Sequence, residues 1–216
     1  MQEVILRMQD IRKTFPGVVA LDNVNLDVRS GTVHSLMGEN GAGKSTLMKC
    51  LIGMYTPDEG TVELAGDIVR FKDTKDGLEH GISMIHQELS PVPEMMVAEN
   101  IWLGREPRGR LGLLSPAAMF RKTRELFDEW KINIDPKARM KDLTVSKQQM
   151  VEIAKAISYD AKIIIMDEPT FGQDRRTFIE LVRLLRGLRE EGITLAAITH
   201  DELFIALMGQ HHIEVR

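Results

Sequence analysis

The most informative part of the sequence is Gly38-Glu39-Asn40-Gly41-Ala42-Gly43-Lys44-Ser45-Thr46. It matches the phosphate-binding pattern of Gly, four residues, Gly-Lys and then Ser or Thr. The glycines allow a tight turn that points successive backbone N–H groups at a phosphate, and a following helix adds positive partial charge. We expect Lys44 to reach the β- and γ-phosphates of a nucleotide and the Ser45 hydroxyl to coordinate Mg²⁺. The sequence therefore predicts a polyphosphate site in this loop.

The segments on both sides of this loop predict an α/β fold. A strand is expected over Thr32–Met37 and a helix from Lys44 to about Met54, followed by a turn. The continuous apolar run Ile163–Met166 is typical of a buried parallel strand. Because strands alternate with helices along the chain, the core sheet is expected to be mostly parallel with right-handed crossovers.

The first thirty residues predict an antiparallel β edge to this core. Val4–Met8 and Val18–Val28 have strand-like patterns, and Arg12–Gly17 between them is interpreted as a turn. Phe15 is the one large apolar side chain in that turn. Further along, Thr61–Leu64 and Ile68–Phe71 are expected to form a hairpin.

Residues 90–160 differ in character, because they contain helical patterns and no convincing strand. Helices are expected over Val97–Leu103, Pro116–Trp130 and Lys147–Ser158, with Ser115 as the N-cap of the second. We interpret this region as a helical subdomain inserted in the core. The predicted organisation is one domain, 1–216, with the nucleotide-binding core and its β subdomain in 1–89 and 161–216 and the helical subdomain in 90–160.

The composition is that of a globular protein. Hydrophobic residues make up 43% of the chain and charged residues 28%, with a formal net charge of −4. No basic block supports a nucleic-acid partner. The single cysteine, Cys50, excludes an internal disulfide and is interpreted as a small buried hydrophobic residue. No apolar run is long enough for a membrane span, so we expect a soluble, cytoplasmic chain whose membrane association comes through a partner.

Two adjacent acids follow the apolar strand that ends at Met166. The carboxyl ends of the strands are where an open α/β sheet places its ligands. We expect Asp167 to hold Mg²⁺ together with Ser45, and Glu168 to polarise the water that attacks the γ-phosphate.

With these motifs the chain resembles an ATP-binding-cassette (ABC) transporter ATPase over essentially its whole length. The motifs that carry the resemblance are the phosphate loop, Gln87, Leu143-Thr144-Val145-Ser146-Lys147-Gln148-Gln149, Asp167-Glu168-Pro169-Thr170, Asp174 and His200. The resemblance implies a P-loop NTPase that uses ATP and Mg²⁺.

The resemblance also implies roles for side chains that the residue pattern alone does not explain. Phe15 is similar to the aromatic residue that stacks on adenine. Gln87 is similar to the mobile glutamine that senses Mg²⁺ and the attacking water, and His200 to the switch histidine at the γ-phosphate. Asp174 corresponds to the loop that follows the catalytic acids and lies at the dimer interface.

The signature sequence of this family, Leu-Ser-Gly-Gly-Gln, is altered here. Thr144 keeps the hydroxyl that would bind the γ-phosphate held by the opposite subunit, while Val145, Ser146 and Lys147 replace Gly, Gly and Gln. A side chain at Ser146 stands where the backbone must approach phosphate closely, which would weaken that contact. Similar variants occur in the sugar-importer branch of the family, so we interpret the change as a mark of that class and not as inactivation. The expected contacts to the opposite subunit's site are Leu143, Thr144, Val145, Ser146, Lys147 and Gln148.

From Asp10 to Thr170 the chain is most similar to the galactose and methyl-galactoside class of import ATPases. After Thr170 the segments Phe171–Arg176 and Thr199–Glu202 look more like the ATPases of vitamin and cobalt importers. Sugar-class ATPases usually carry two cassettes, so a truncated, recombined or engineered cassette is expected.

The resemblance implies MgATP hydrolysis coupled to the import of a small solute, such as a sugar. The expected partners are a second ATPase subunit, head to tail, integral membrane permease subunits and, indirectly, a periplasmic or extracellular solute-binding protein. The expected location is the inner face of the membrane. Two alternatives stay open: a soluble cassette protein that acts on nucleic acid or ribosomes, which the acidic charge disfavours, and an ATP-binding module with impaired hydrolysis.

Overall fold

The computed structural model describes residues 3–39, 41–109 and 112–214. Their contacts group the chain into two compact units. The first unit comprises Met1–Gln87, Ala161–Thr170 and Leu185–Arg216, and the second comprises Glu88–Asp160 and Phe171–Leu184. The boundaries expected from the sequence stay a prediction, and each unit is described by itself.

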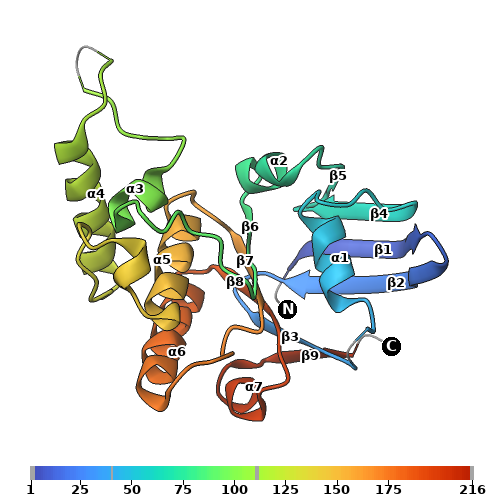
Figure 1. The fold of residues 1–216 in the computed structure, drawn as a ribbon. Helices are drawn as coiled ribbons and strands as arrows, with labels where there is room; N and C mark the ends of the chain where they lie inside the picture. Colours follow the sequence, from blue (N-terminus) through green and yellow to red (C-terminus); the bar gives the residue numbers. More distant parts are fainter. Residues whose placement is uncertain (1–2, 40, 110–111, 215–216) are drawn as a thin grey trace. The chain divides into compact units, whose positions relative to one another are not determined.

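A five-stranded parallel sheet forms the centre of the first unit (Figure 1). The spatial order of its strands is β6-β7-β8-β3-β9, which differs from their order in the sequence. Side chains of β7 and β8 are almost all buried, as expected when both faces of a parallel sheet are covered. The strands are β3 (Val33–Met37), β6 (Ile82–Ile85), β7 (Ile163–Asp167), β8 (Thr194–Ile198) and β9 (His211–Glu214).

A second sheet in the same unit is antiparallel and has the order β2-β1-β4-β5. Its strands are β1 (Val4–Phe15), β2 (Val18–Arg29), β4 (Glu59–Leu64) and β5 (Asp67–Val69). The sequence prediction of a turn over Arg12–Gly17 is wrong for most of that segment. Thr14 and Phe15 pair with Val19 and Val18, and only Pro16-Gly17 forms the turn, with Gly17 at φ 79°. Cross-strand pairing extends both strands as far as Phe15 and Val18. The two residues between them form a tight turn, which the positive φ of Gly17 allows.

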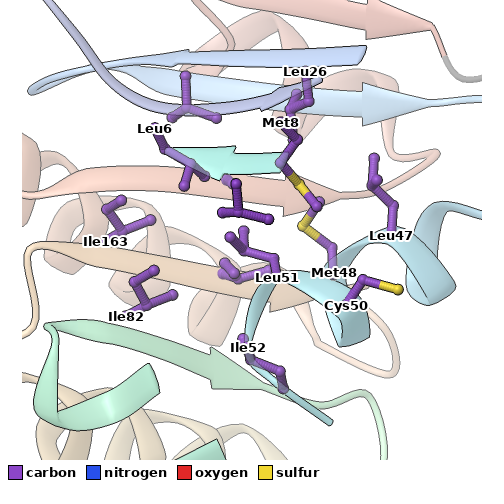
Figure 2. Packing of buried hydrophobic residues seen from close by; sticks show 14 of the residues in the cluster. Leu6, Met8, Leu26, Leu47, Met48, Cys50, Leu51, Ile52, Ile82 and Ile163 are labelled. Atoms are coloured by element: carbon purple, nitrogen blue, oxygen red, sulfur yellow. The ribbon is translucent and has the colours of Figure 1, made fainter. Parts of the chain in front are cut away.

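The hydrophobic core of the first unit joins its two sheets through α1 (Lys44–Leu51). Leu47, Met48 and Leu51 of this helix are buried beside Leu6 and Met8 of β1. Figure 2 shows the side chains of Met8 and Met48 pointing toward one another. Because α1 begins at the phosphate loop, this packing fixes the loop relative to both sheets. Two further helices of the unit are α2 (Thr74–Glu79) and α7 (Glu202–Met208).

Cys50 lies in the same core, as the sequence predicts. Its side chain is buried, and burial raises the pKa of the thiol to about 11. The thiol is therefore neutral and unreactive at physiological pH.

The second unit is helical among its described residues. It contains α3 (Val97–Trp102), α4 (Pro116–Glu129), a 3₁₀ helix (Met140–Asp142), α5 (Val145–Ile157) and the first part of α6 (Arg175–Glu190). Ser115 is the N-cap of α4, as predicted, with Pro116 at the first helical position. Across the described ranges 3–39, 41–109 and 112–214, every helix is too short or too polar to span a bilayer.

Candidate functional site

The phosphate loop connects β3 to α1 and has the backbone that its glycines predict. Gly38, Gly41 and Gly43 have φ values of 146°, 91° and 85°. A Cβ atom at Gly43 would lie 2.6 Å from the carbonyl oxygen of Ala20, so only glycine lets the loop approach β2 this closely. Asn40, which was also predicted to bind ATP, lies outside the described residues.

The side chain of Lys44 lies across the loop. Its ammonium donates hydrogen bonds to the carbonyl oxygens of Gly38, at 2.6 Å, and Glu39, at 2.9 Å. The residue is only 6% exposed although it carries a charge. A buried ammonium held by two carbonyl dipoles is well placed to bind an anion, because a phosphate would supply the missing negative charge.

Ser45 and Asp167 meet at the end of β7. The Ser45 hydroxyl donates a hydrogen bond to Asp167 Oδ2 at 3.3 Å. A hydroxyl and a carboxylate are hard oxygen ligands, and Mg²⁺ usually takes one or two protein ligands and completes its shell with phosphate and water. Within the part of the chain that the structure describes, no cluster of three or more His, Cys, Asp and Glu side chains offers a closed metal cage. The donor set therefore fits Mg²⁺ bound together with a nucleotide.

Glu168 has an unusual backbone conformation. Its φ is 48°, in the left-handed region, and its N–H donates to the carbonyl oxygen of Ile198 at 2.8 Å. Such strain in a residue other than glycine often marks a functional position. The carboxylate is half-buried and lies 3.7 Å from Nε2 of His200, which follows β8. The left-handed turn thus points an acid at the position where β7 and β8 both end.

The strand order explains how residues far apart in the sequence come to one place. Because β6, β7, β8 and β3 are parallel neighbours, their carboxyl ends lie at the same edge of the sheet. Gln87 follows β6, Asp167 and Glu168 end β7, His200 follows β8, and the phosphate loop follows β3. Gln87 and His200 are exposed there.

Phe15 lies at the tip of the antiparallel sheet and is 36% exposed. Its ring meets that of Tyr55 edge-on, with the centroids 5.2 Å apart. The phosphate loop contacts the partner strand, since Gly43 approaches Ala20 and Leu21 of β2. The hairpin that carries Phe15 is therefore in direct contact with the loop that carries Lys44.

The altered signature lies in the second unit, at the start of α5. Thr144 is the N-cap of this helix, and its hydroxyl oxygen accepts a hydrogen bond from the N–H of Lys147 at 3.4 Å. Val145 is 60% exposed, whereas Ser146 is buried. The Gln148 amide donates to the carbonyl oxygens of Met140 and Leu143, so it supports the turn before the helix.

Asp174 precedes α6 in the same unit. Its carboxylate accepts hydrogen bonds from the N–H groups of Thr177 and Arg176, which hold its pKa below the usual range. The neighbouring Gln173 donates to the side chain of Gln149 on α5. This hydrogen bond connects the segment after Thr170 to α5, and it could not be predicted because an amide pair 24 residues apart leaves no local signal in the sequence.

Comparisons with known proteins point to one family. The model of the ABC transporter family matches residues 21–171. The chain is 56% identical over 205 residues to a protein of Geobacillus kaustophilus named as a ribose/galactose/methyl galactoside import ATP-binding protein. That match covers 94% of this chain and 41% of the relative, and it includes part of the segment after Thr170. A protein of Hahella chejuensis with the same name is 53% identical over 94% of this chain and 40% of its own length. The chain thus spans about two fifths of the curated relatives that it matches.

Solved structures agree with this match. An ATP-binding cassette of an ABC transporter in its ADP conformation has a TM-score of 0.86 and 27% identity, over 99% of this chain and 87% of its own. A dimeric cassette in a post-hydrolysis state bound to ADP and Pi has a TM-score of 0.82 and 26% identity, over 98% of this chain and 94% of its own. Both confirm the α/β cassette fold expected from the sequence.

Proposed function

Because the chain belongs to the ABC transporter family of ATP-binding cassettes, we propose that it binds MgATP and hydrolyses it to drive the import of a small solute. The observation that carries the proposal is the common edge of β6, β7, β8 and β3, which gathers a phosphate loop, an oxygen pair for Mg²⁺ and an acid beside a histidine. The names of the relatives support a sugar as the solute.

The phosphate loop supplies the binding step. Its backbone N–H groups and the ammonium of Lys44 hold the β- and γ-phosphates, and the ring of Phe15 stacks on adenine. The remaining residues expected to contact ATP are Gly38, Glu39, Asn40, Gly41, Ala42, Gly43 and Thr46. Ser45, Asp167 and Gln87 hold Mg²⁺, which when bound neutralises charge on the phosphates.

Glu168 and His200 supply the chemical step. Glu168 accepts the proton of the attacking water, a role supported by its position directly after Asp167, which accepts a hydrogen bond from Ser45 of the phosphate loop. His200, whose Nε2 lies 3.7 Å from the Glu168 carboxylate, is the residue that hydrogen-bonds the γ-phosphate. A positioned base contributes on the order of 10²–10⁴ in rate.

A second copy completes the site. The Thr144 hydroxyl and the first N–H groups of α5 bind the γ-phosphate held by the opposite copy, and Asp174 lies at the interface between the copies. Dimeric cassettes among the solved structures support this arrangement. The further partners are membrane permease subunits and, through them, a solute-binding protein, which places the chain at the inner face of the membrane.

The test is an ATPase and nucleotide-binding assay on the purified chain with a Glu168→Gln variant. We expect the variant to bind ATP as the wild type does and to lose at least a hundredfold in hydrolysis. Glu202→Gln is the matched control, because Glu202 is exposed two residues after His200 and should leave the rate unchanged.

Three results would count against the proposal in different ways. Normal turnover of Glu168→Gln would remove Glu168 from the role of base. A wild-type chain that binds ATP without hydrolysing it would support the alternative of an impaired module. A chain that binds no nucleotide would refute the proposed function.

A further inference from the structure

A hydrogen-bonded cluster joins the end of β1 to the loop that follows α1. Asp58 Oδ2 accepts hydrogen bonds from the N–H and the hydroxyl of Thr14, both at 2.7 Å. Asp58 Oδ1 accepts from the ammonium of Lys13 at 2.8 Å, and that ammonium also donates to the carbonyl oxygen of Thr56 at 2.8 Å. We call these four residues, Lys13, Thr14, Thr56 and Asp58, the Asp58 clamp.

The clamp differs from an ordinary surface ion pair. Its lysine side chain is only 16% exposed, and the backbone of Asp58 adds a hydrogen bond to the carbonyl oxygen of Arg12 at 2.8 Å. The bonds from Lys13 and then from Thr14 lower the pKa of the Asp58 carboxyl to about 2, so it is charged at neutral pH. Since several bonds converge on backbone groups, the clamp fixes main-chain positions and not only side chains.

The residues next to the clamp are the two aromatic rings at the tip of the sheet. Phe15 follows Thr14, and Tyr55 precedes Thr56, so each ring is one residue from a clamped backbone. The rings meet edge-on with centroids 5.2 Å apart, and the Lys13 ammonium lies 5.6 Å from the centre of Phe15. Phe15 is still 36% exposed beside these two neighbours, so its ring keeps accessible surface for another flat group.

The same loop also connects to the phosphate loop. Tyr55 N–H donates to the carbonyl oxygen of Lys49 in α1 at 3.1 Å, and α1 begins at Lys44. The loop from Thr56 to Gly60 lines an open cavity of about 200 Å³, so part of it lacks packed neighbours. Glu59 and Gly60 at its end belong to β4, which pairs with β1, so the hydrogen bonds to Lys13 and Thr14 fix the part of the loop that precedes this pairing.

We propose that Asp58 is a positioning residue for the nucleotide base. It holds Phe15 through Thr14, and Tyr55 through Thr56, in fixed positions relative to the phosphate loop. This inference rests on the proposed function, in which Phe15 stacks on adenine. Asp58 itself touches no nucleotide. It keeps the Phe15 ring in place before the base binds. The entropy cost of immobilising that side chain on binding is therefore smaller.

The test is the substitution Asp58→Asn, which keeps the size of the side chain but removes its charge and one acceptor oxygen. Dissociation constants are measured with Mg²⁺ for ATP and for inorganic tripolyphosphate, which has no base. We expect binding of ATP to weaken roughly tenfold and binding of tripolyphosphate to change less than twofold, because base–aromatic stacking is the contribution being lost.

A double-mutant cycle with Phe15→Ala separates positioning from a general structural role. If Asp58 acts through Phe15, the double variant should bind ATP no more weakly than Phe15→Ala alone. Asp27→Asn is the matched control, because it breaks another ion pair that starts on β1, to Arg7 at 2.9 Å, far along the strand from Phe15. It should leave both dissociation constants within about twofold.

Equal losses for ATP and tripolyphosphate, or additive losses in the cycle, would overturn the inference and leave Asp58 as a structural residue. The cycle uses ATP alone, so it decides the question even where tripolyphosphate binds too weakly to measure. A wild-type chain that binds no ATP would instead refute the proposed function, so the two failures are distinguishable.

Discussion

Replacing Gly43 by alanine tests how the phosphate loop is built. Gly43 has a φ of 85°, and its added Cβ would lie 2.6 Å from the carbonyl oxygen of Ala20 and 2.7 Å from Cδ2 of Leu21. Gly41, in the same loop, has a φ of 91° but no atom within 4 Å of an added Cβ. The two substitutions therefore share the backbone strain and differ in the clash.

The magnitudes follow from these distances. A left-handed alanine costs about 1–2 kcal/mol, and the smaller entropy of the unfolded chain offsets about 0.4–1 kcal/mol of this in both variants. The clash at Gly43 adds about 1–3 kcal/mol, because a backbone carbonyl cannot move aside as a flexible side chain can. For a chain of this length, 1 kcal/mol shifts Tm by roughly 2–4 °C. Gly43→Ala should therefore melt roughly 2–12 °C below Gly41→Ala.

The assay is thermal unfolding in buffer without nucleotide, since a ligand bound only to the native state would raise Tm and hide the difference. Both variants are compared with the wild type at the same protein concentration. If Gly43→Ala were as stable as Gly41→Ala, the close contact between the phosphate loop and β2 would be wrong. The connection of Lys44 to the hairpin of Phe15 through this contact would then be refuted as well.

Two further predictions concern a buried histidine and the signature helix. Burial lowers the pKa of His34 to about 4, so the unfolded state takes up its proton first as pH falls. The contribution of neutral His34 to the free energy of unfolding is fully present above pH 6.5. It should decrease by up to about 3 kcal/mol as the pH falls to about 4. Urea unfolding across this range should show a shallower pH dependence for His34→Gln. Thr144→Ala should cost about 1 kcal/mol of stability by removing an N-cap, and in a Glu168→Gln background with ATP it should weaken dimerisation in sedimentation. Thr144→Ser is the control that keeps both properties, and a dimer of unchanged affinity in Thr144→Ala would contradict the assigned role.

The elements around the phosphate loop could be predicted because their signals are local. Apolar runs such as Ile163–Met166 predict a buried strand wherever they occur, and the glycine pattern of the loop predicts its turns. The structure confirms both. The N-cap at Ser115 could also be predicted, because an N-cap depends only on its own residue and the three that follow.

Features that depend on partners far along the chain could not be predicted. The extension of β1 to Phe15 results from pairing with β2, and it overrides the turn signal that begins at Arg12. The bonds between Thr14 and Asp58 join residues 44 positions apart, and nothing in the residues around Asp58 indicates its partner. The positive φ of Glu168 is also invisible in a sequence, because glutamate gives no sign that its backbone is strained.

The exposure of the signature residues bears on the proposed contact between this segment and phosphate. The sequence draws attention to Ser146, since a side chain there would hinder the approach of phosphate. Ser146 is buried, however, whereas Val145 beside it is 60% exposed. The Thr144 oxygen accepts a hydrogen bond from Lys147, which leaves its O–H free to donate to a phosphate. Under the proposed function, a second copy that approaches the start of α5 meets the Thr144 hydroxyl and the exposed Val145, and we propose that the fit around Val145, more than the bulk of Ser146, determines how tightly the two copies close over ATP.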